Sequence, residues 1–360
     1  MKRQKVLYCA STDTHLLRFH LPYIKALSKT CDVCVMGNGS TFSHKAPFCK
    51  QMLSPKNLLA LLEIRRLLRR ERFDLILTHT ALASFLVRLA AKGLSRPPRI
   101  TVTVHGYLFS EKLCSAKDRL LLLCEKLVRG QTDLLLVMNR EDLALAKRYD
   151  LSQGKIRLIR GMGLPARERN AKPIHLRRRL GLSDKDLLCL YVGELSKRKN
   201  QLFLIRAFHT LRQKGEDVFL VLVGDGAERE TILEEIRKRH MEDTVFLAGE
   251  EKEVYPYLLE ADLYVSASRS EGLPFNLLEA MEVGLPILAS RVKGQEDLLG
   301  DCPDALYPEG DEEAFCRCLL ALKKAGRLGR GSHAYPKLDR YRLDSVFAEN
   351  LALLRGGMPK

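Results

Sequence analysis

The amino-acid sequence predicts an α/β protein with two doubly wound domains, each built on a parallel sheet that helices cover on both faces. The chain has 360 residues, which exceeds one ordinary core and suits two domains of roughly 150 to 180 residues. Short runs rich in Val, Leu and Ile alternate with helical patterns along it. These runs are almost continuously apolar, which is typical of strands buried on both faces of a parallel sheet.

Six β-rich runs occur in the first half of the chain, and helical patterns separate them. The first run follows the basic start MKRQ and is too short for a secretory signal, so we interpret it as a buried strand. The other runs lead into polar or Gly-containing segments, where strands are expected to end. The predicted strands lie within residues 5–10, 31–37, 73–79, 99–106, 133–139 and 155–163.

Five further β-rich runs in the second half predict a second sheet of the same kind. Residues 163–172 are rich in Gly, Pro and charge, and a helical pattern begins after them. We therefore expect one domain over residues 1–165, a second over residues 166–334, and a helical C-terminal segment over residues 335–360. The predicted strands of the second domain lie within residues 187–195, 218–226, 245–249, 262–268 and 285–291.

The most informative residues follow predicted strands. Ligands of doubly wound parallel sheets bind beyond the carboxyl ends of the strands. His79 and His105 occupy such positions in the first half of the chain. Residues 193–199, Gly224 and Glu271 occupy them in the second half. We therefore expect the functional residues at these strand ends.

The segment SRSEGLPFNLLEAMEVGLPILAS, residues 268–290, carries the strongest functional signal, because it holds Glu271 and Glu279 with seven residues between them. Gly272 and Pro274 predict a turn between a strand and an apolar helix. Backbone amides at the start of such a helix point toward an anion above the turn. A carboxylate further along can accept two hydrogen bonds from a diol such as a ribose. The pattern predicts a site for a diphosphate and its neighbouring sugar.

This segment resembles the EX7E signature of glycosyltransferase family 4, whose members are retaining enzymes that have the GT-B fold and use nucleotide-sugar donors. The loop GELSKRKNQ is similar to the phosphate-binding loop of that family, and LVGDGAERETILEE resembles its second strand–turn–helix unit. FHLPYIKALSK and TVHGYLF are most similar to the subset that builds bacterial exopolysaccharide or capsule repeat units. The resemblance implies two Rossmann-like domains facing a cleft, the first binding the acceptor and the second the nucleotide sugar. The last helix would cross back to the N-terminal domain.

The resemblance also implies roles for individual residues. Lys199 would neutralise the departing diphosphate, Glu271 would lie near the donor sugar and phosphates, and Glu279 would hold the ribose hydroxyls. The implied catalytic residues are His105, Lys199 and Glu271. The implied donor-binding residues are Gly193, Arg198, Lys199, Gly272, Leu273, Pro274, Asn276 and Glu279.

One position departs from the family pattern. Many relatives have an arginine directly after the loop glycine, whereas Glu194 follows Gly193 here. Arg198, in the same loop, is a candidate replacement for that cation. A different donor geometry or weaker donor binding is the alternative.

The first half contributes a second group of implied site residues. By resemblance, His105 hydrogen-bonds the donor sugar or steadies charge near its anomeric carbon. Acceptor contacts are expected from Asp13, His15 and His20, in the loop and helix after the first strand. We expect no metal site and no cofactor, because Lys199 would supply the charge that a divalent metal provides elsewhere.

The composition of the chain favours some classes of binding partner over others. The content of 46% hydrophobic and 29% charged residues is typical of a globular protein, and no apolar run approaches the ~20 residues that span a bilayer. The ten cysteines have no export signal, so we expect reduced thiols. The net charge of +16 suits a phosphorylated substrate or an anionic membrane surface. Aromatic residues do not alternate with the basic ones, which argues against nucleic acid.

The segment NLLALLEIRRLLRRERFD, residues 57–74, predicts a basic amphipathic helix. It can lie on acidic lipid headgroups, or it can pack on the first sheet with a solvated basic face, and the two interpretations are compatible. Its predicted apolar stripe contains Leu58, Leu61, Leu62 and Leu68, and its charge comes from Arg65, Arg66, Arg69, Arg70 and Arg72.

The leading hypothesis is a cytoplasmic, retaining glycosyltransferase, peripheral at the inner face of the membrane. It would move a hexose or N-acetylhexosamine from a UDP-sugar to a lipid-linked or saccharide acceptor in bacterial surface polysaccharide synthesis. Two alternatives are a nucleotide-sugar epimerase of GT-B fold and a non-catalytic sugar-nucleotide-binding protein. A nucleic-acid-binding protein is the weakest of the alternatives.

Overall fold

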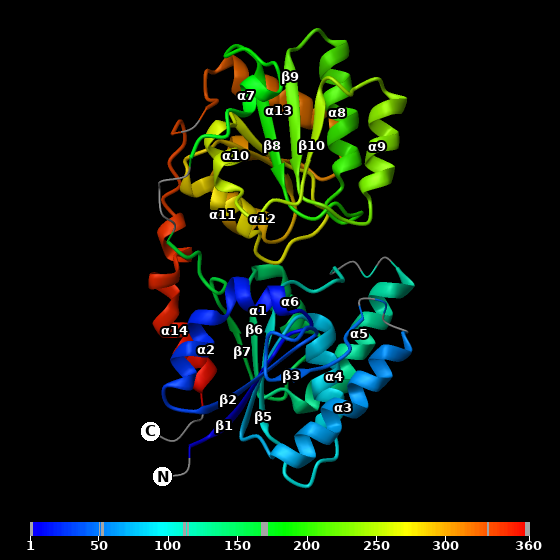
Figure 1. Cartoon of the computed structure of the whole chain (residues 1–360), viewed down its shortest axis with the longest axis vertical. Coiled ribbons are helices and arrows are strands. Elements are labelled where there is room, and N and C mark those ends of the chain that lie inside the picture. Colours follow the sequence, from blue (N-terminus) through cyan, green and yellow to red (C-terminus); the bar gives the residue numbers. More distant parts are fainter. Residues whose placement is uncertain are drawn as a thin grey trace. The chain divides into compact units, whose positions relative to one another are not determined.

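The computed structural model describes residues 3–49, 51, 54–110, 113, 115–166, 172–329 and 331–356. The chain forms two compact units, one of residues 1–163 with 343–360 and the other of residues 164–342. Each is a parallel sheet flanked by helices (Figure 1). Part of the predicted 163–172 linker, residues 167–171, lies outside the described residues.

The division differs from the expected one at the C-terminal side. The second unit begins at Leu164, close to the expected boundary after residue 165, but the return to the first unit begins at Leu343 instead of residue 335. The intervening residues belong to the second unit because they pack on it. The Tyr335 hydroxyl donates to the Leu285 carbonyl at 2.9 Å, and Leu338 is buried in the same core.

The first unit has a seven-stranded sheet in the order β3-β2-β1-β4-β5-β6-β7, and every pairing is parallel. Six strands fall within the predicted ranges, and the two-residue edge strand β3 is additional. The carboxyl ends of β1, β4 and β5 lie side by side because these strands are neighbours. The strands are β1 Lys5–Cys9, β2 Asp32–Gly37, β3 His44–Lys45, β4 Leu75–His79, β5 Arg99–Val104, β6 Leu134–Val137 and β7 Lys155–Leu158.

Helices cover both faces of this sheet (Figure 1). They are α1 Asp13–Phe19, α2 Leu21–Ser28, α3 Pro55–Glu71, α4 Ala81–Ala91, α5 Ala116–Val128, α6 Arg140–Arg148, α14 Leu343–Arg355 and the short 3₁₀ helix Arg129–Gln131. Ile64, Val87 and Leu122 bring α3, α4 and α5 into one core with the strands. The C-terminal helix α14 packs beside α2, where Asn350 Nδ2 donates to the Tyr23 hydroxyl at 3.1 Å and to the Gly161 carbonyl at 2.8 Å.

The second unit has a six-stranded parallel sheet in the order β10-β9-β8-β11-β12-β13. Successive residues of a strand point to opposite faces, and β8 shows this alternation. Leu188 and Leu190 enter one core, whereas Cys189 and Tyr191 enter the other. The strands are β8 Leu187–Val192, β9 Val218–Val223, β10 Val245–Gly249, β11 Leu263–Ser266, β12 Ile287–Arg291 and β13 Leu306–Pro308.

The helices of the second unit follow its strands in turn. They are α7 Leu176–Arg179, α8 Gln201–Gln213, α9 Arg229–Lys238, α10 Tyr255–Glu260, α11 Phe275–Glu282, α12 Gln295–Leu299 and α13 Glu312–Lys324, with 3₁₀ helices at Pro303–Ala305 and Leu338–Tyr341. Across the described parts of both units, every helix is too short or too polar to cross a bilayer.

Candidate functional site

The loop between β8 and α8 holds the first set of predicted site residues. Gly193 follows β8 with a φ of +148°, a conformation that favours glycine. The next strand end presses against it, because a Cβ atom added to Gly224 would lie 2.1 Å from the Gly193 carbonyl oxygen. The Gly193 amide donates to the Val223 carbonyl at 2.9 Å. The two glycines therefore let the carboxyl ends of β8 and β9 approach closely and fix the start of the loop.

Lys199, Arg198 and Glu271 form an ion cluster across 72 residues of sequence. Lys199 Nζ donates to Glu271 Oε1 at 2.5 Å, and Arg198 Nη1 donates to Glu271 Oε2 at 3.0 Å. Arg198 Nη1 also donates to the Ser270 carbonyl at 2.7 Å. Two cations thus share one carboxylate between the β8–α8 and β11–α11 loops, which leaves one positive charge over. The structure places Arg198 in this cluster, whereas Glu194 is exposed.

Burial and charge act against each other in this cluster. The Lys199 side chain is 10% exposed and that of Glu271 7%, whereas Arg198 keeps 40% of its side-chain surface exposed. Burial lowers the pKa of Lys199, although the charge of Glu271 opposes this. Burial would raise the pKa of Glu271, but Lys199 and Arg198 outweigh it and lower that pKa below its ordinary value. Glu271 is therefore ionised at neutral pH.

The predicted strand–turn–helix around the two glutamates is present as β11, a loop and α11. The Asn276 side chain turns back to β8, where its Nδ2 donates to the Val192 carbonyl at 2.7 Å. The Tyr264 hydroxyl donates to the same carbonyl at 3.1 Å. Glu279, 3% exposed, lies one helical turn after Asn276 on α11. Both glutamates add to the effect of burial in raising the pKa of Tyr264. Tyr264 was not among the predicted site residues, because a tyrosine within an apolar strand is typical of a buried core position.

The loop that carries Glu271 rests on a buried polar network. Gln295 Nε2 donates to Ser266 Oγ at 2.7 Å. The Ser290 hydroxyl lies 2.5 Å from the Ser268 carbonyl oxygen and 3.1 Å from Gln295 Oε1, and its one hydrogen can be donated to either of them. Gly294 approaches the loop so closely that a Cβ atom there would lie 2.4 Å from the Gly272 carbonyl oxygen. The network and the close approach hold the loop in one conformation. Leu273 and Pro274 continue it into α11.

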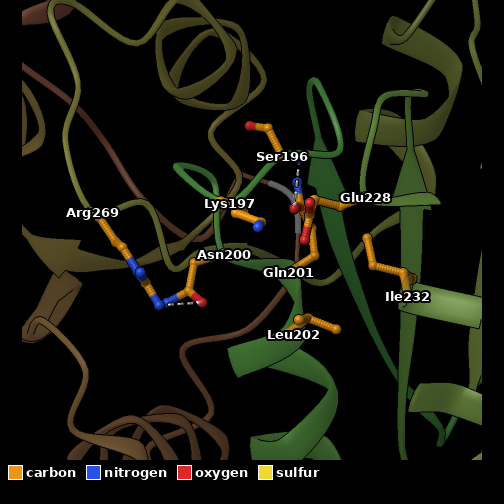
Figure 2. Close-up of a pocket in the computed structure, with 8 residues that line it drawn as sticks. All are labelled: Ser196, Lys197, Asn200, Gln201, Leu202, Glu228, Ile232 and Arg269. Carbon is orange, nitrogen blue, oxygen red and sulfur yellow. Dashed lines mark hydrogen bonds between the residues drawn. The ribbon is translucent and has the colours of Figure 1, made fainter. Parts of the chain in front are cut away.

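A small hollow of about 200 Å³ lies beside the same β8–α8 loop (Figure 2). Arg269 Nη2 donates to Asn200 Oδ1 at 3.5 Å on one side, and the Ser196 amide donates to Gln201 Oε1 at 3.2 Å on another. Its volume is below the ~300 Å³ at which ligand pockets begin. Its lining is Ser196, Lys197, Asn200, Gln201, Leu202, Glu228, Ile232 and Arg269, so the ion cluster stands outside it.

The first unit gathers four histidines at the carboxyl ends of β1, β4 and β5. Nε2 of His15 lies 3.1 Å from Nε2 of His20 and 3.4 Å from Nε2 of His105. Nδ1 of His79 lies 3.4 Å from Nε2 of His105. The Tyr8 hydroxyl lies 2.9 Å from Nδ1 of His20. The predicted residues His15, His20 and His105 are thus in contact, and sequence reasoning missed their neighbours His79 and Tyr8 as members of one cluster.

Burial determines the charge state of this histidine cluster. It lowers the pKa of His15 to about 4. Burial also lowers the pKa values of His20, His79 and His105 well below the ordinary histidine value, and neighbouring histidines add to the effect. All four imidazoles are therefore neutral at pH 7.

Asp13 occupies a different position from the histidines it was grouped with. Its carboxylate accepts hydrogen bonds from the Gly39 amide at 3.0 Å and the Thr41 amide at 3.2 Å. Gly37 is required beside it, because a Cβ atom there would lie 2.0 Å from an Asp13 oxygen. Burial alone would raise the pKa of Asp13, but these amide donors lower it. The structure thus gives the carboxylate a role in holding the β2–β3 loop, and an acceptor contact stays a prediction.

The predicted apolar stripe of α3 is divided between the core and the surface. Leu68 is buried and Leu61 packs against the core, whereas Leu58 and Leu62 are 60% and 45% exposed. The buried side of the helix also contains Ala60 and Ile64. The outer surface of α3 therefore carries leucines among its exposed arginines.

Two family models match the chain, one in each unit. The model described as "Glycosyltransferase Family 4" matches residues 26–161. The model described as "Glycosyl transferases group 1" matches residues 174–326. The second match includes the whole ion cluster and Glu279.

Known proteins agree with these matches. "Putative glycosyltransferase EpsD" of Bacillus subtilis (strain 168) is 30% identical over 350 residues, which cover 91% of each chain. The UDP-Gal:alpha-D-GlcNAc-diphosphoundecaprenol alpha-1,3-galactosyltransferase of Escherichia coli is 26% identical over 76% of this chain and 72% of its own. The crystal structure of Anabaena Alr3699/HepE in complex with UDP-glucose superposes with a TM-score of 0.75 at 16% identity, covering 98% of this chain and 100% of that one. The chain is therefore a member of glycosyltransferase family 4, an enzyme of the GT-B fold.

Proposed function

We propose that this glycosyltransferase moves a hexose or N-acetylhexosamine from a UDP-sugar, with retention of anomeric configuration, to a lipid-linked saccharide acceptor. The process would be the synthesis of a bacterial surface polysaccharide. The observation that carries this proposal is the cluster of Lys199, Arg198 and Glu271, together with the buried Glu279 on the following helix. Binding a nucleotide sugar requires cations beside its diphosphate and a hydrogen-bond acceptor beside its ribose diol, and these two groups are neighbours in the donor.

The chemistry follows from the charge of the cluster. When the bond between the anomeric carbon and the donor phosphate breaks, negative charge grows on the leaving diphosphate. Lys199 and Arg198 carry two positive charges against the one negative charge of Glu271, so the cluster can stabilise that developing charge. Glu279 would accept hydrogen bonds from the ribose hydroxyls. The acceptor hydroxyl forms the new bond to the anomeric carbon on the face the phosphate leaves, and its proton passes to that phosphate.

Two of the similar proteins support the choice of substrates. The name of the Escherichia coli relative specifies a UDP-galactose donor and a diphosphoundecaprenol-linked acceptor. The Anabaena structure contains UDP-glucose. We extend a UDP-sugar donor and a lipid-linked acceptor to this chain on those grounds.

The decisive experiment incubates the purified chain with a panel of nucleotide sugars, with and without a membrane lipid extract. Lys199→Met should lower kcat about 10²- to 10³-fold, because it removes charge from the leaving group. Glu279→Ala should raise the donor KM about 10- to 100-fold, because two hydrogen bonds to the side-chain oxygens are lost. Lys197→Met, an exposed neighbour in the same loop, is the matched control. Wild-type turnover in both site variants would refute the assignment.

The same experiment separates transfer from epimerisation. An epimerase would interconvert nucleotide sugars in the absence of acceptor, whereas a transferase needs the lipid extract to form product. The anomeric configuration of that product, read by NMR, tests retention. An inverted product would contradict the proposed stereochemistry and leave the transferase assignment in place.

We also propose that transfer needs no divalent metal, because Lys199 and Arg198 supply charge at the diphosphate. A chelator should leave activity within about twofold of its original value. A change of that size corresponds to a change in the activation barrier of well under 1.4 kcal/mol. Complete loss of activity that magnesium restores would contradict this part of the proposal.

We further propose that the enzyme is cytoplasmic and works at the inner face of the membrane through α3 and α5. Exposed leucines stand among basic residues on both helices, including Leu58 at 60% and Leu123 at 62% exposure. Leucines that enter the headgroup region beside arginines suit an anionic lipid surface. The other exposed leucines of these helices are Leu59, Leu62, Leu120 and Leu127.

Sedimentation with phosphatidylglycerol vesicles tests this surface. Replacing Arg66, Arg69 and Arg70 by Gln should weaken binding about 100-fold, at about 1 kcal/mol per charge. Arg65 is left unchanged, because its Nη1 donates to the Ala90 carbonyl at 2.8 Å and holds α3 in place. Unchanged sedimentation of the variant would remove the membrane surface from the proposal. A control variant loses three exposed charges of the second unit: Arg237, Lys238 and Lys252.

A further inference from the structure

The histidine cluster of the first unit contains three convergent ring nitrogens. His15 and His20 lie at the two ends of α1, and His105 directly follows β5. The ligand atoms of these three residues all lie within 4.8 Å of one another. The two ends of α1 and the end of β5 thus bring three potential metal ligands to one point.

Hydrogen bonding alone does not account for this arrangement. A ring nitrogen of a neutral imidazole has either one hydrogen or one lone pair, so it makes one hydrogen bond. Nε2 of His15 nevertheless has two ring nitrogens within 3.4 Å, those of His20 and His105. Nε2 of His105 likewise has two such neighbours, Nε2 of His15 and Nδ1 of His79, each at 3.4 Å. These three short distances between ring nitrogens therefore cannot all be hydrogen bonds at the same time.

We propose that Nε2 of His15, His20 and His105 bind a divalent transition-metal ion, with Zn²⁺ as the best fit. Zinc–nitrogen bonds of about 2.0 to 2.1 Å in a tetrahedron separate the ligand atoms by about 3.3 Å. Nε2 of His15 lies 3.1 Å from Nε2 of His20 and 3.4 Å from that of His105. Imidazole ligands suit Zn²⁺, Cu²⁺ and Ni²⁺ far better than Mg²⁺ or Ca²⁺. Three protein ligands leave a fourth position for water or a ligand oxygen.

The surroundings of the cluster support a metal ligand set. Metal-bound histidines use their second ring nitrogen in a hydrogen bond that orients the ring. The Tyr8 hydroxyl stands 2.9 Å from Nδ1 of His20 and fills this role for the most buried of the three ligands. His15 and His105 are only partly buried, so an ion can enter past them.

Metal binding at Nε2 of His105 competes with the role that the family resemblance implies for that nitrogen, a hydrogen bond to the donor sugar. A metal-bound Nε2 has no lone pair and no hydrogen left for a sugar hydroxyl. Zn²⁺ should therefore inhibit transfer, a consequence that rests on the proposed function. Metal binding itself does not rest on it. If one Zn²⁺ binds per chain and transfer is unaffected, the metal site is confirmed and the implied role of His105 in donor binding is refuted.

The test is a metal titration of the whole purified chain after chelator treatment and desalting. Zn²⁺ should bind in a ratio of one per chain in competition with a chromophoric zinc indicator. His15→Gln and His105→Gln should each weaken binding more than about 100-fold, and Tyr8→Phe about 10-fold, as expected for a ligand and for its hydrogen-bond partner. His44→Gln, on the edge strand β3 of the same unit, should bind as the wild type does.

Cobalt provides a readout that does not depend on the variants folding. Co²⁺ bound to wild type should show the strong visible bands of a tetrahedral site without a thiolate charge-transfer band, which excludes the cysteines. Binding that persists in both histidine variants, a thiolate band, or no stoichiometric binding by the wild type would each overturn the proposal.

Discussion

The buried ion cluster of the second unit predicts that Lys199→Met should rescue Glu271→Gln. Replacing Glu271 by Gln removes the only carboxylate that Lys199 Nζ contacts at hydrogen-bond distance within the described residues. The Lys199 ammonium then stays buried beside the Arg198 cation without its hydrogen-bonded carboxylate, and the remaining favourable charge comes from the exposed Glu194. Deleting the ammonium should therefore restore part of the lost stability, which is unusual for a second substitution in a buried site.

The magnitudes follow from the exposure of the three side chains. Removing one partner of a buried ion pair costs about 3 to 5 kcal/mol, and Lys199 and Glu271 are 10% and 7% exposed. Lys199→Met alone should cost less, about 1 to 3 kcal/mol, because Glu271 keeps its hydrogen bond from Arg198 at 3.0 Å. The double variant should be more stable than Glu271→Gln by at least about 1 kcal/mol, since it leaves no buried unpaired charge.

Urea unfolding of the full chain at pH 7 measures these differences in the free energy of unfolding. Far-UV circular dichroism follows the transition, because the chain has no tryptophan to report by fluorescence. Hydrogen exchange of amides 263–282 assigns the transition to the second unit. Glu271 has a pKa below its ordinary value of 4.5, so its contribution is fully present above that pH and is lost as the pH falls through the folded-state value. If Lys199→Met and Glu271→Gln destabilise additively, the cluster is not a coupled buried pair and the argument fails.

Three more predictions concern single positions. Gly224→Ala should destabilise the second unit by more than about 2 kcal/mol and raise the donor KM, because the new Cβ atom would lie 2.1 Å from the Gly193 carbonyl oxygen; urea unfolding and donor kinetics check this. Asp13→Asn should cost about 1 to 3 kcal/mol by weakening the amide hydrogen bonds of the β2–β3 loop, and should increase exchange of the amides of residues 38–41. Asn350→Leu should detach α14, because hydrogen bonds to Tyr23 and Gly161 are lost; faster proteolysis after residue 343 would show it, and unchanged cleavage would contradict it.

Much of the fold could be predicted because strand burial is visible locally. Runs of Val, Leu and Ile bounded by polar or Gly-containing segments predicted eleven strands, and each contains a strand of the structure. The strands β3 and β13 have two and three residues, too few for a sequence pattern. The end of the second unit was misplaced because the attachment of Tyr335 depends on the Leu285 carbonyl, 50 residues away.

Many residues of the candidate site could be predicted from the sequence, but the contacts between them could not. The resemblance indicated Lys199 and Glu271, but it did not show that one carboxylate holds two cations. Asp13 was grouped with the histidines because it precedes them in sequence, whereas its carboxylate binds a loop 26 residues further on. Which leucines of α3 are buried could not be predicted, because the helix has leucines around much of its circumference. Burial of Ile64 and Leu68 and exposure of Leu58 depend on the neighbouring elements.

Which segments become parallel strands, and which residues lie at their ends, can be predicted from local sequence, since both depend on apolar runs and on the residues that terminate them. Which of those residues come into contact depends on the three-dimensional arrangement of the strands. His15, His20 and His105 come together because β1, β4 and β5 are neighbours in one sheet, although β2 and β3 intervene in the chain. Lys199 meets Glu271 because β8 and β11 are neighbours in the other. Strand order is chosen by packing of the whole unit, and no local stretch of sequence contains that information.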